Sequence, residues 1–176
     1  MGFGGLLKVD CKLLALDLCI QLVNNFDCQA RIVVVKGHIA EVIIIEVGIV
    51  LGIPSSGTSV VVTDKRRRKV FNKVQALKGV SLTTLEQNIR LGSVDRLFKR
   101  SFILYALTVL LCLTSKNAPT PTLLDDVADV SNPSQYNWGQ LVLDWLINEI
   151  QEFRVARELK KSLEGCMFFL MICCVS

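Results

Sequence analysis

The centre of the chain reads Phe98-Lys-Arg-Ser-Phe-Ile-Leu-Tyr-Ala-Leu-Thr-Val-Leu-Leu-Cys-Leu-Thr114, and a second block further along reads Tyr136-Asn-Trp-Gly-Gln-Leu-Val-Leu-Asp-Trp-Leu146. The first block begins with basic residues and continues as an apolar run that contains no glycine or proline. This composition predicts a long central helix over residues 93–113.

The second block predicts another helix, which carries both tryptophans of the chain. Its apolar residues follow the i, i+3, i+4, i+7 spacing of one helix face, and Asn137 can cap its start. We expect Trp145 to be the more deeply buried tryptophan, facing the central helix. The predicted structural anchors are Phe102, Tyr105, Trp138 and Trp145.

The rest of the pattern predicts a mainly α domain with a small β element. Further helices are expected over 10–24, 41–51, 83–92 and 122–130, and after Gly165. Asp10 is suited to cap the start of the first of these helices. Thr83 and Glu86 form a capping-box pattern at the start of the helix over 83–92. The three isoleucines at 43–45 leave a strand as the alternative there. A β-hairpin is predicted near residues 30–40, with 60–63 as the candidate third strand. The sequence thus favours one domain over residues 1–176, of about six or seven helices, with a basic loop at 55–69 and a Pro/Thr linker at 116–122.

The apolar content of 51% raises the question of membrane insertion. The longest charge-free runs are 101–115 and 165–176, with 15 and 12 residues. A helix that crosses the hydrocarbon core needs roughly 20 apolar residues. Buried helices are therefore the favoured interpretation, and a small membrane-associated helical protein stays an alternative.

The charge of the chain is unevenly distributed. Residues 65–100 hold eleven basic and two acidic residues, whereas the remainder holds nine basic and fourteen acidic ones. The density is highest in the run Lys65, Arg66, Arg67, Arg68 and Lys69. A run of this kind is typical of nuclear localisation or of phosphate contact, and it also occurs as a solvated loop. It predicts a nuclear protein, with a cytoplasmic one as the alternative, and allows nucleic-acid binding through residues 65–100.

The sequence predicts no enzyme, cofactor or metal site. Gly52 and Gly57 have the spacing of a phosphate loop, but Thr58 stands where that loop needs lysine, so a tight turn is expected. His38 is the only histidine, and it lies in the predicted hairpin. The seven cysteines are scattered without a C-x-x-C pair, which fits small buried side chains in a reduced compartment.

Further motifs extend the two helical blocks. They are Gly2-Phe-Gly-Gly-Leu-Leu7, Asn25-Phe-Asp27, Val47-Gly-Ile-Val-Leu-Gly-Ile-Pro54 with Gly57, and Gly165-Cys-Met-Phe-Phe-Leu170. In this order the blocks resemble the plant mobile domain, a transposon-derived family also labelled "aminotransferase-like". They also resemble the region upstream of ubiquitin-like-protein-specific cysteine proteases in plant transposon genes. The chain departs from the family pattern at Glu46, where aspartate is expected, and it starts and stops at the edges of family elements, as a fragment does.

The resemblance implies a non-enzymatic nuclear interaction module with a protein partner. The roles it implies are transposon silencing, genome maintenance and plant development. The family's label invites a pyridoxal-phosphate mechanism, but no lysine here lies in an identifiable phosphate-binding context. The alternative function is a phosphate-contacting, nucleic-acid-binding fragment of a transposon-encoded protein.

Overall fold

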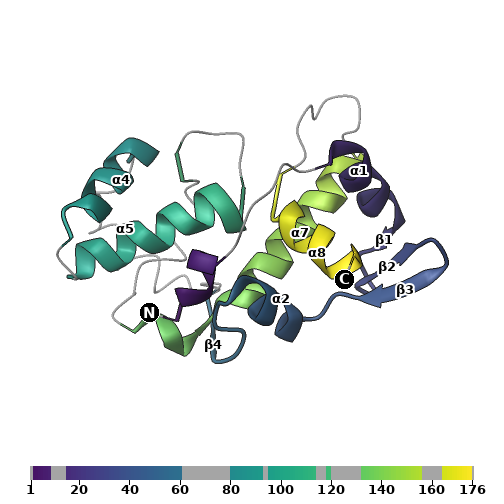
Figure 1. Cartoon of the computed structure of the whole chain (residues 1–176), viewed down its shortest axis with the longest axis horizontal. Helices are drawn as coiled ribbons and strands as arrows, with labels where there is room; N and C mark the ends of the chain where they lie inside the picture. The colour runs from purple at the N-terminus through teal and green to yellow at the C-terminus, as the bar shows by residue number, and fades with distance from the viewer. Residues whose placement is uncertain are drawn as a thin grey trace.

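The computed structural model describes residues 2–8, 15–60, 80–92, 95–113, 118–119, 132–155 and 164–175. The fold is mainly α, as predicted (Figure 1). Its α-helices in these residues are α1 (Leu16–Asn25), α2 (Ile44–Leu51), α4 (Leu82–Arg90), α5 (Arg96–Ala106), α7 (Trp138–Val155) and α8 (Met167–Val175). The expected Asp10 cap, the basic run, strand positions 61–63, the helix over 122–130 and most of the linker lie outside the described residues.

The predicted hairpin is confirmed. It consists of β2 (Ile32–Val35) and β3 (His38–Glu41), which pair antiparallel. β1 (Phe26–Asp27) pairs with β2 on its other side. β1 follows α1 directly and returns into β2 through a four-residue turn, a short connection between neighbouring strands. Of the predicted strand near 60–63 only Val60 is described.

α7 runs through the middle of the molecule, with α2, α8 and α1 around it (Figure 1). α2 packs on α7 and α8, and α1 packs on α8 and β2. The side chains between them form an apolar core. Its fully buried members include Leu22, Val33, Val47, Leu51, Val142, Leu146, Ile150 and Phe169.

Close backbone approaches join the N-terminal segment to the end of α2. Gly52 ends α2 in the left-handed conformation, with φ of +59°. A Cβ at Gly52 would lie 2.2 Å from Cα of Gly5, so only glycine fits there. The Gly139 N–H donates to the Pro54 carbonyl at 2.9 Å, and β4 (Thr58–Ser59) pairs parallel with β5 (Tyr136–Asn137). The segment between Gly52 and Gly57 is therefore a packed turn, as expected.

α4 and α5 lie side by side away from the sheet (Figure 1). The expected capping residue of α4 was wrong: Ser81, and not Thr83, accepts the Thr84 N–H at 3.2 Å. The predicted central helix begins later, at Arg96, where Asp95 accepts the Phe98 N–H. It ends in a π-helical turn, η3 (Leu107–Leu111).

Candidate functional site

An open hollow of about 670 Å³ lies between the C-terminal parts of α1 and α7 and the sheet. Its volume falls in the range of roughly 300–1,000 Å³ that is typical of ligand pockets. We call it the α1–α7 hollow. It is lined by Asn24, Asn25, Phe26, Asp27, Cys28, Gln29, Ile32, Val34, Gln151 and Arg154.

Arg154 forms a fixed wall of the hollow. Its Nη2 donates to the carbonyl oxygens of Val23, Asn24 and Phe26, which lie at and just beyond the end of α1. Helix C-termini leave carbonyl groups unpaired and carry partial negative charge, so a guanidinium is well suited to this position. These bonds hold the Arg154 side chain in place beside the hollow.

The lining of the hollow is partly aliphatic and partly polar. Ile32 and Val34 lie on the same face of β2, and Val34 is 41% exposed. The lining also carries side-chain amides, each of which offers both a donor and an acceptor. These amides belong to Asn24, Asn25, Gln29 and Gln151.

The surroundings of Asp27 and Cys28 shift the pKa values of both side chains. The Asp27 carboxylate accepts the N–H groups of Ala30 and Gln29, and these bonds lower the pKa of Asp27. Burial raises the pKa of the Cys28 thiol, although Arg154 acts in the opposite direction. At neutral pH the hollow therefore holds a carboxylate and a protonated thiol.

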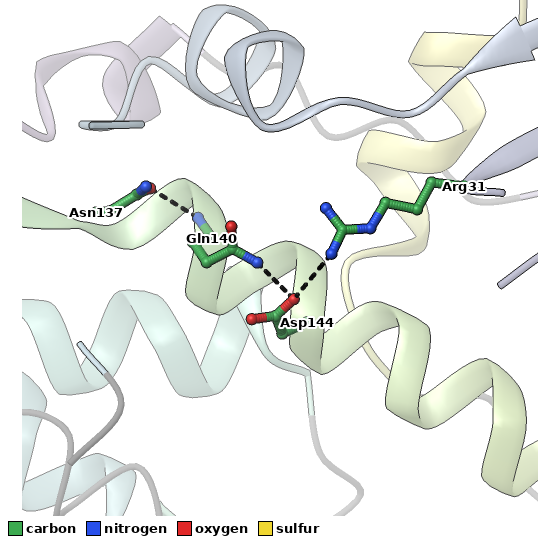
Figure 2. Close-up of polar contacts among 4 residues, drawn as sticks. All are labelled: Arg31, Asn137, Gln140 and Asp144. Carbon is green, nitrogen blue, oxygen red and sulfur yellow. Dashed lines mark hydrogen bonds and ion pairs between the residues drawn. The ribbon is translucent and has the colours of Figure 1, made fainter. Parts of the chain in front are cut away.

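A polar ladder joins the turn after β1 to α7. Figure 2 shows the Arg31 guanidinium 3.8 Å from the Asp144 carboxylate. The same carboxylate accepts a hydrogen bond from the side-chain amide of Gln140 at 2.5 Å. Asn137 accepts the Gln140 N–H at 2.9 Å, so its predicted capping role is confirmed. Arg31 has a φ of +56°, which is rare outside glycine, and its ion pair helps to hold that turn beside α7.

Residues 1–171 match the model of a family described as Domain of unknown function (DUF8566). The chain belongs to this family. No curated protein and no solved structure matches it. The match spans all described elements up to residue 171, and the family description gives no activity. The resemblance to the plant mobile domain stays a prediction.

In this DUF8566 chain, the predicted anchors are buried to different depths. Trp138 is 1% exposed, donates from Nε1 to the Pro133 carbonyl at 2.7 Å and packs edge-on against Phe3, at 5.4 Å between ring centroids. Phe3 also contacts Phe102, at 6.3 Å. Trp145 is only half-buried, as are Phe102 and Tyr105. The expected order of the two tryptophans was wrong, because Phe3 comes from the other end of the sequence to cover Trp138.

The predicted phosphate contacts, Lys65, Arg66, Arg67, Arg68 and Lys69, lie outside the described residues. Other basic residues gather at the start of α5. Arg96, Lys99 and Arg100 have no ion pair among the residues that the structure describes, whereas Arg90 of α4 pairs with Glu86 at 2.7 Å. Burial, with a smaller contribution from Arg96, lowers the pKa of Arg100.

The sequence predicted neither a catalytic nor a metal site. His38 is exposed at the start of β3. Across the described ranges, no three His, Cys, Asp or Glu side chains are grouped to hold a metal ion. In the same ranges, no helix is long and apolar enough to span a membrane.

Sequence patterns missed the α1–α7 hollow, because its lining combines residues 24–34 with Gln151 and Arg154, which lie more than 110 residues further along the chain. Asn24 was predicted only as the end of the first helix, and Asn25 only as the start of the Asn25-Phe-Asp27 motif. Nothing local to Arg154 indicates that it binds carbonyls more than 120 residues earlier in the chain.

Proposed function

We propose that the chain is a non-enzymatic nuclear interaction module that binds an extended segment of a partner protein in the α1–α7 hollow. The observation that carries the proposal is the hollow itself, whose lining combines aliphatic side chains with side-chain amides. Peptide backbones present alternating donors and acceptors, which side-chain amides can match. Apolar side chains of the same segment are suited to contact with Ile32 and Val34.

Rigidity supports the same proposal. Arg154 is bound to three carbonyl groups. Arg31, in the turn that carries Gln29, also forms a surface ion pair with Asp144 of α7. A preformed site loses little conformational entropy on binding, so more of the contact energy appears as affinity.

The nuclear location and the biological roles rest on other features. The run at 65–69 favours nuclear import. The resemblance to the plant mobile domain adds a transposon-derived origin, and roles in transposon silencing, genome maintenance or plant development. Replacing all five basic residues by alanine, in a chain fused to a tag too large for passive entry, is expected to move the protein to the cytosol. An unchanged nuclear signal would remove the import role.

Peptide selection tests the binding proposal. A displayed library of random twelve-residue peptides, selected against the full chain, is expected to yield peptides with aliphatic residues. Val34→Glu places a charge in the lining of the hollow and should weaken their binding about tenfold or more, as measured by fluorescence anisotropy. Leu97→Glu is the matched control, since Leu97 is 47% exposed but lies on α5. Failure to select any peptide, or equal binding by Val34→Glu, would overturn the proposal.

A second candidate function is phosphate contact through α5. It is favoured by Arg96, Lys99 and Arg100, which cluster on two turns without an ion pair in the described part of the chain. Each phosphate contact adds about 0.9 to the log–log salt slope of duplex DNA binding. Replacing Arg96 and Lys99 by glutamine should therefore reduce the slope by about 1.8. An unchanged slope, or no binding at low salt, would exclude α5 as the contact.

A further inference from the structure

The Arg154 guanidinium uses its two terminal nitrogens differently. Nη2 donates to the three carbonyl oxygens at the end of α1, whereas Nη1 contacts the sulfur of Cys28 at 3.8 Å. Sulfur is a weak acceptor, so this contact uses little of the hydrogen-bonding capacity of Nη1. Cys28 lines the α1–α7 hollow together with Arg154. A strong acceptor that enters the hollow beside Cys28 can therefore bind Nη1 without breaking the bonds to α1.

The positive charge of Arg154 lacks a carboxylate partner within the segments that the structure describes, where it forms no ion pair. Asp27 also lines the hollow, but its carboxylate accepts the N–H groups of Ala30 and Gln29. These two bonds lower the pKa of Asp27 more than Arg154 does. Asp27 is exposed, so water screens its charge, whereas Arg154 is partly buried. A charged group that enters the hollow should therefore respond more to the cation than to the anion.

A side-chain amide lies next to this cation. Gln151 and Arg154 are i, i+3 neighbours on α7, and both line the hollow. The Gln151 side chain is exposed, and its amide nitrogen offers two N–H donors. A carboxylate has two acceptor oxygens, so one oxygen can bind Nη1 of Arg154 while the other binds the Gln151 amide. The two side chains together form a binding position for one carboxylate.

We propose that the hollow selects partner segments with an acidic side chain, whose carboxylate binds between Arg154 and Gln151. This inference rests on the proposed function and names the chemistry of the segment: an aspartate or glutamate, flanked by aliphatic residues that contact Ile32 and Val34. Hydrogen bonds to an ionised acceptor are about twice as strong as neutral ones, so the acidic residue should add markedly to affinity. Phosphopeptide sites use clusters of arginines, whereas the described lining contains one, so a carboxylate is the better match.

Matched peptides test the acidic preference. Peptides selected from the random library are synthesised with amidated C-termini, so that a chain-end carboxylate cannot replace the acidic side chain. Each is compared with a version in which glutamate is replaced by glutamine, or aspartate by asparagine. By fluorescence anisotropy with the full chain, the acidic version should bind about tenfold more tightly. Equal affinities of the two versions, or selected peptides enriched in lysine and arginine instead, would overturn the inference.

Gln151→Glu tests the position of the carboxylate while Arg154 stays in place. The new glutamate supplies a carboxylate to Arg154 from the same helix and repels the one on the peptide. Glutamate and glutamine have similar helix propensities, so α7 should be retained.

The two peptide versions should respond differently to this variant. Gln151→Glu should weaken binding of the acidic peptide about tenfold, and that of its amide version less than about twofold. Gln87→Glu is the matched control, because it makes the same change at an exposed position of α4, and it should leave both affinities unchanged. Equal weakening of both peptides by Gln151→Glu, or no weakening of either, would contradict the assigned position.

The acidic preference can fail while the proposed function stands. Selected peptides that bind the parent and lose affinity in Val34→Glu, but show no difference between acidic and amide versions, would overturn the acidic preference alone. The hollow would then remain the binding site. Failure to select any peptide would overturn both proposals.

Discussion

The α4–α5 pair and the region built from α1, the sheet, α7 and α8 are stabilised in different ways (Figure 1). α4 and α5 start at side-chain caps three residues from the N–H groups they bind, at Ser81 and Asp95. α1 instead follows Ala15, which has no polar side chain to cap the helix, and its end is held by Arg154. α4 and α5 therefore begin at local caps, as α7 does at Asn137, whereas the end of α1 is held by a residue more than 120 positions away.

This difference bears on function. The α1–α7 hollow exists only where distant segments meet, so changes that loosen those contacts should also abolish binding. The basic start of α5 belongs to a locally defined pair, and its charges should persist when the hollow is lost. Variants that affect one region, both or neither test this view.

The largest effect is expected at Trp138, which reaches both regions through Phe3 and Phe102. Trp138→Ala should cost about 3–5 kcal/mol of unfolding free energy, because it leaves a large cavity. Trp145→Ala should cost less, since Trp145 is only half-buried. Denaturant unfolding of both variants gives the comparison, with Trp138→Phe as a milder control. A larger loss for Trp145→Ala would contradict the observed order of burial.

The next effect separates close packing from backbone strain. Gly37 and Gly52 both have positive φ, but a Cβ at Gly37 would meet nothing within 4 Å. Gly37→Ala should cost about 1–3 kcal/mol from strain alone. Gly52→Ala should cost a further 1–3 kcal/mol or so, because its methyl group would press on Gly5. Thermal unfolding of the two variants measures the difference, and equal losses would show that the Gly5–Gly52 approach is not tight.

A smaller effect should be confined to the region of the sheet. Arg154→Met removes the bonds to the α1 carbonyls and should cost about 1.5–3 kcal/mol, the range for hydrogen bonds to charged groups. Hydrogen exchange should increase in α1 and β1, and remain as in the parent in α4 and α5. Arg154→Lys keeps the charge but has fewer donors. Its loss of unfolding free energy should therefore be smaller than that of Arg154→Met. Faster exchange in α5 would show that the regions are coupled.

The smallest effect should be confined to α5. Asp95→Ala removes the cap of the Phe98 N–H and should cost about 1 kcal/mol. Asp95→Asn retains an acceptor oxygen and should recover most of the loss. Peptide binding should be the same in all three proteins, and a change in affinity would link α5 to the hollow.

Sequence patterns predicted the elements whose signals are local. The end of α2 at Gly52, the hairpin and the Asn137 cap follow from residues within a few positions of each feature. The predicted α4 cap, Thr83, lies two residues after the observed one, Ser81. Ser81 bonds to Thr84, which is three residues further on, and the predicted pair of Thr83 and Glu86 has the same spacing. The hollow and the cover of Trp138 by Phe3 could not be predicted, since each depends on segments that meet only in the folded chain.

Hydrogen exchange of the full chain, with and without a selected peptide, tests the central claim most directly. We predict that the peptide slows exchange at residues 24–34 and 151–155 and leaves residues 82–106 unchanged. Val34→Glu should abolish this protection, and Leu97→Glu should retain it. Protection confined to 82–106 would contradict the assignment of the α1–α7 hollow as the binding site.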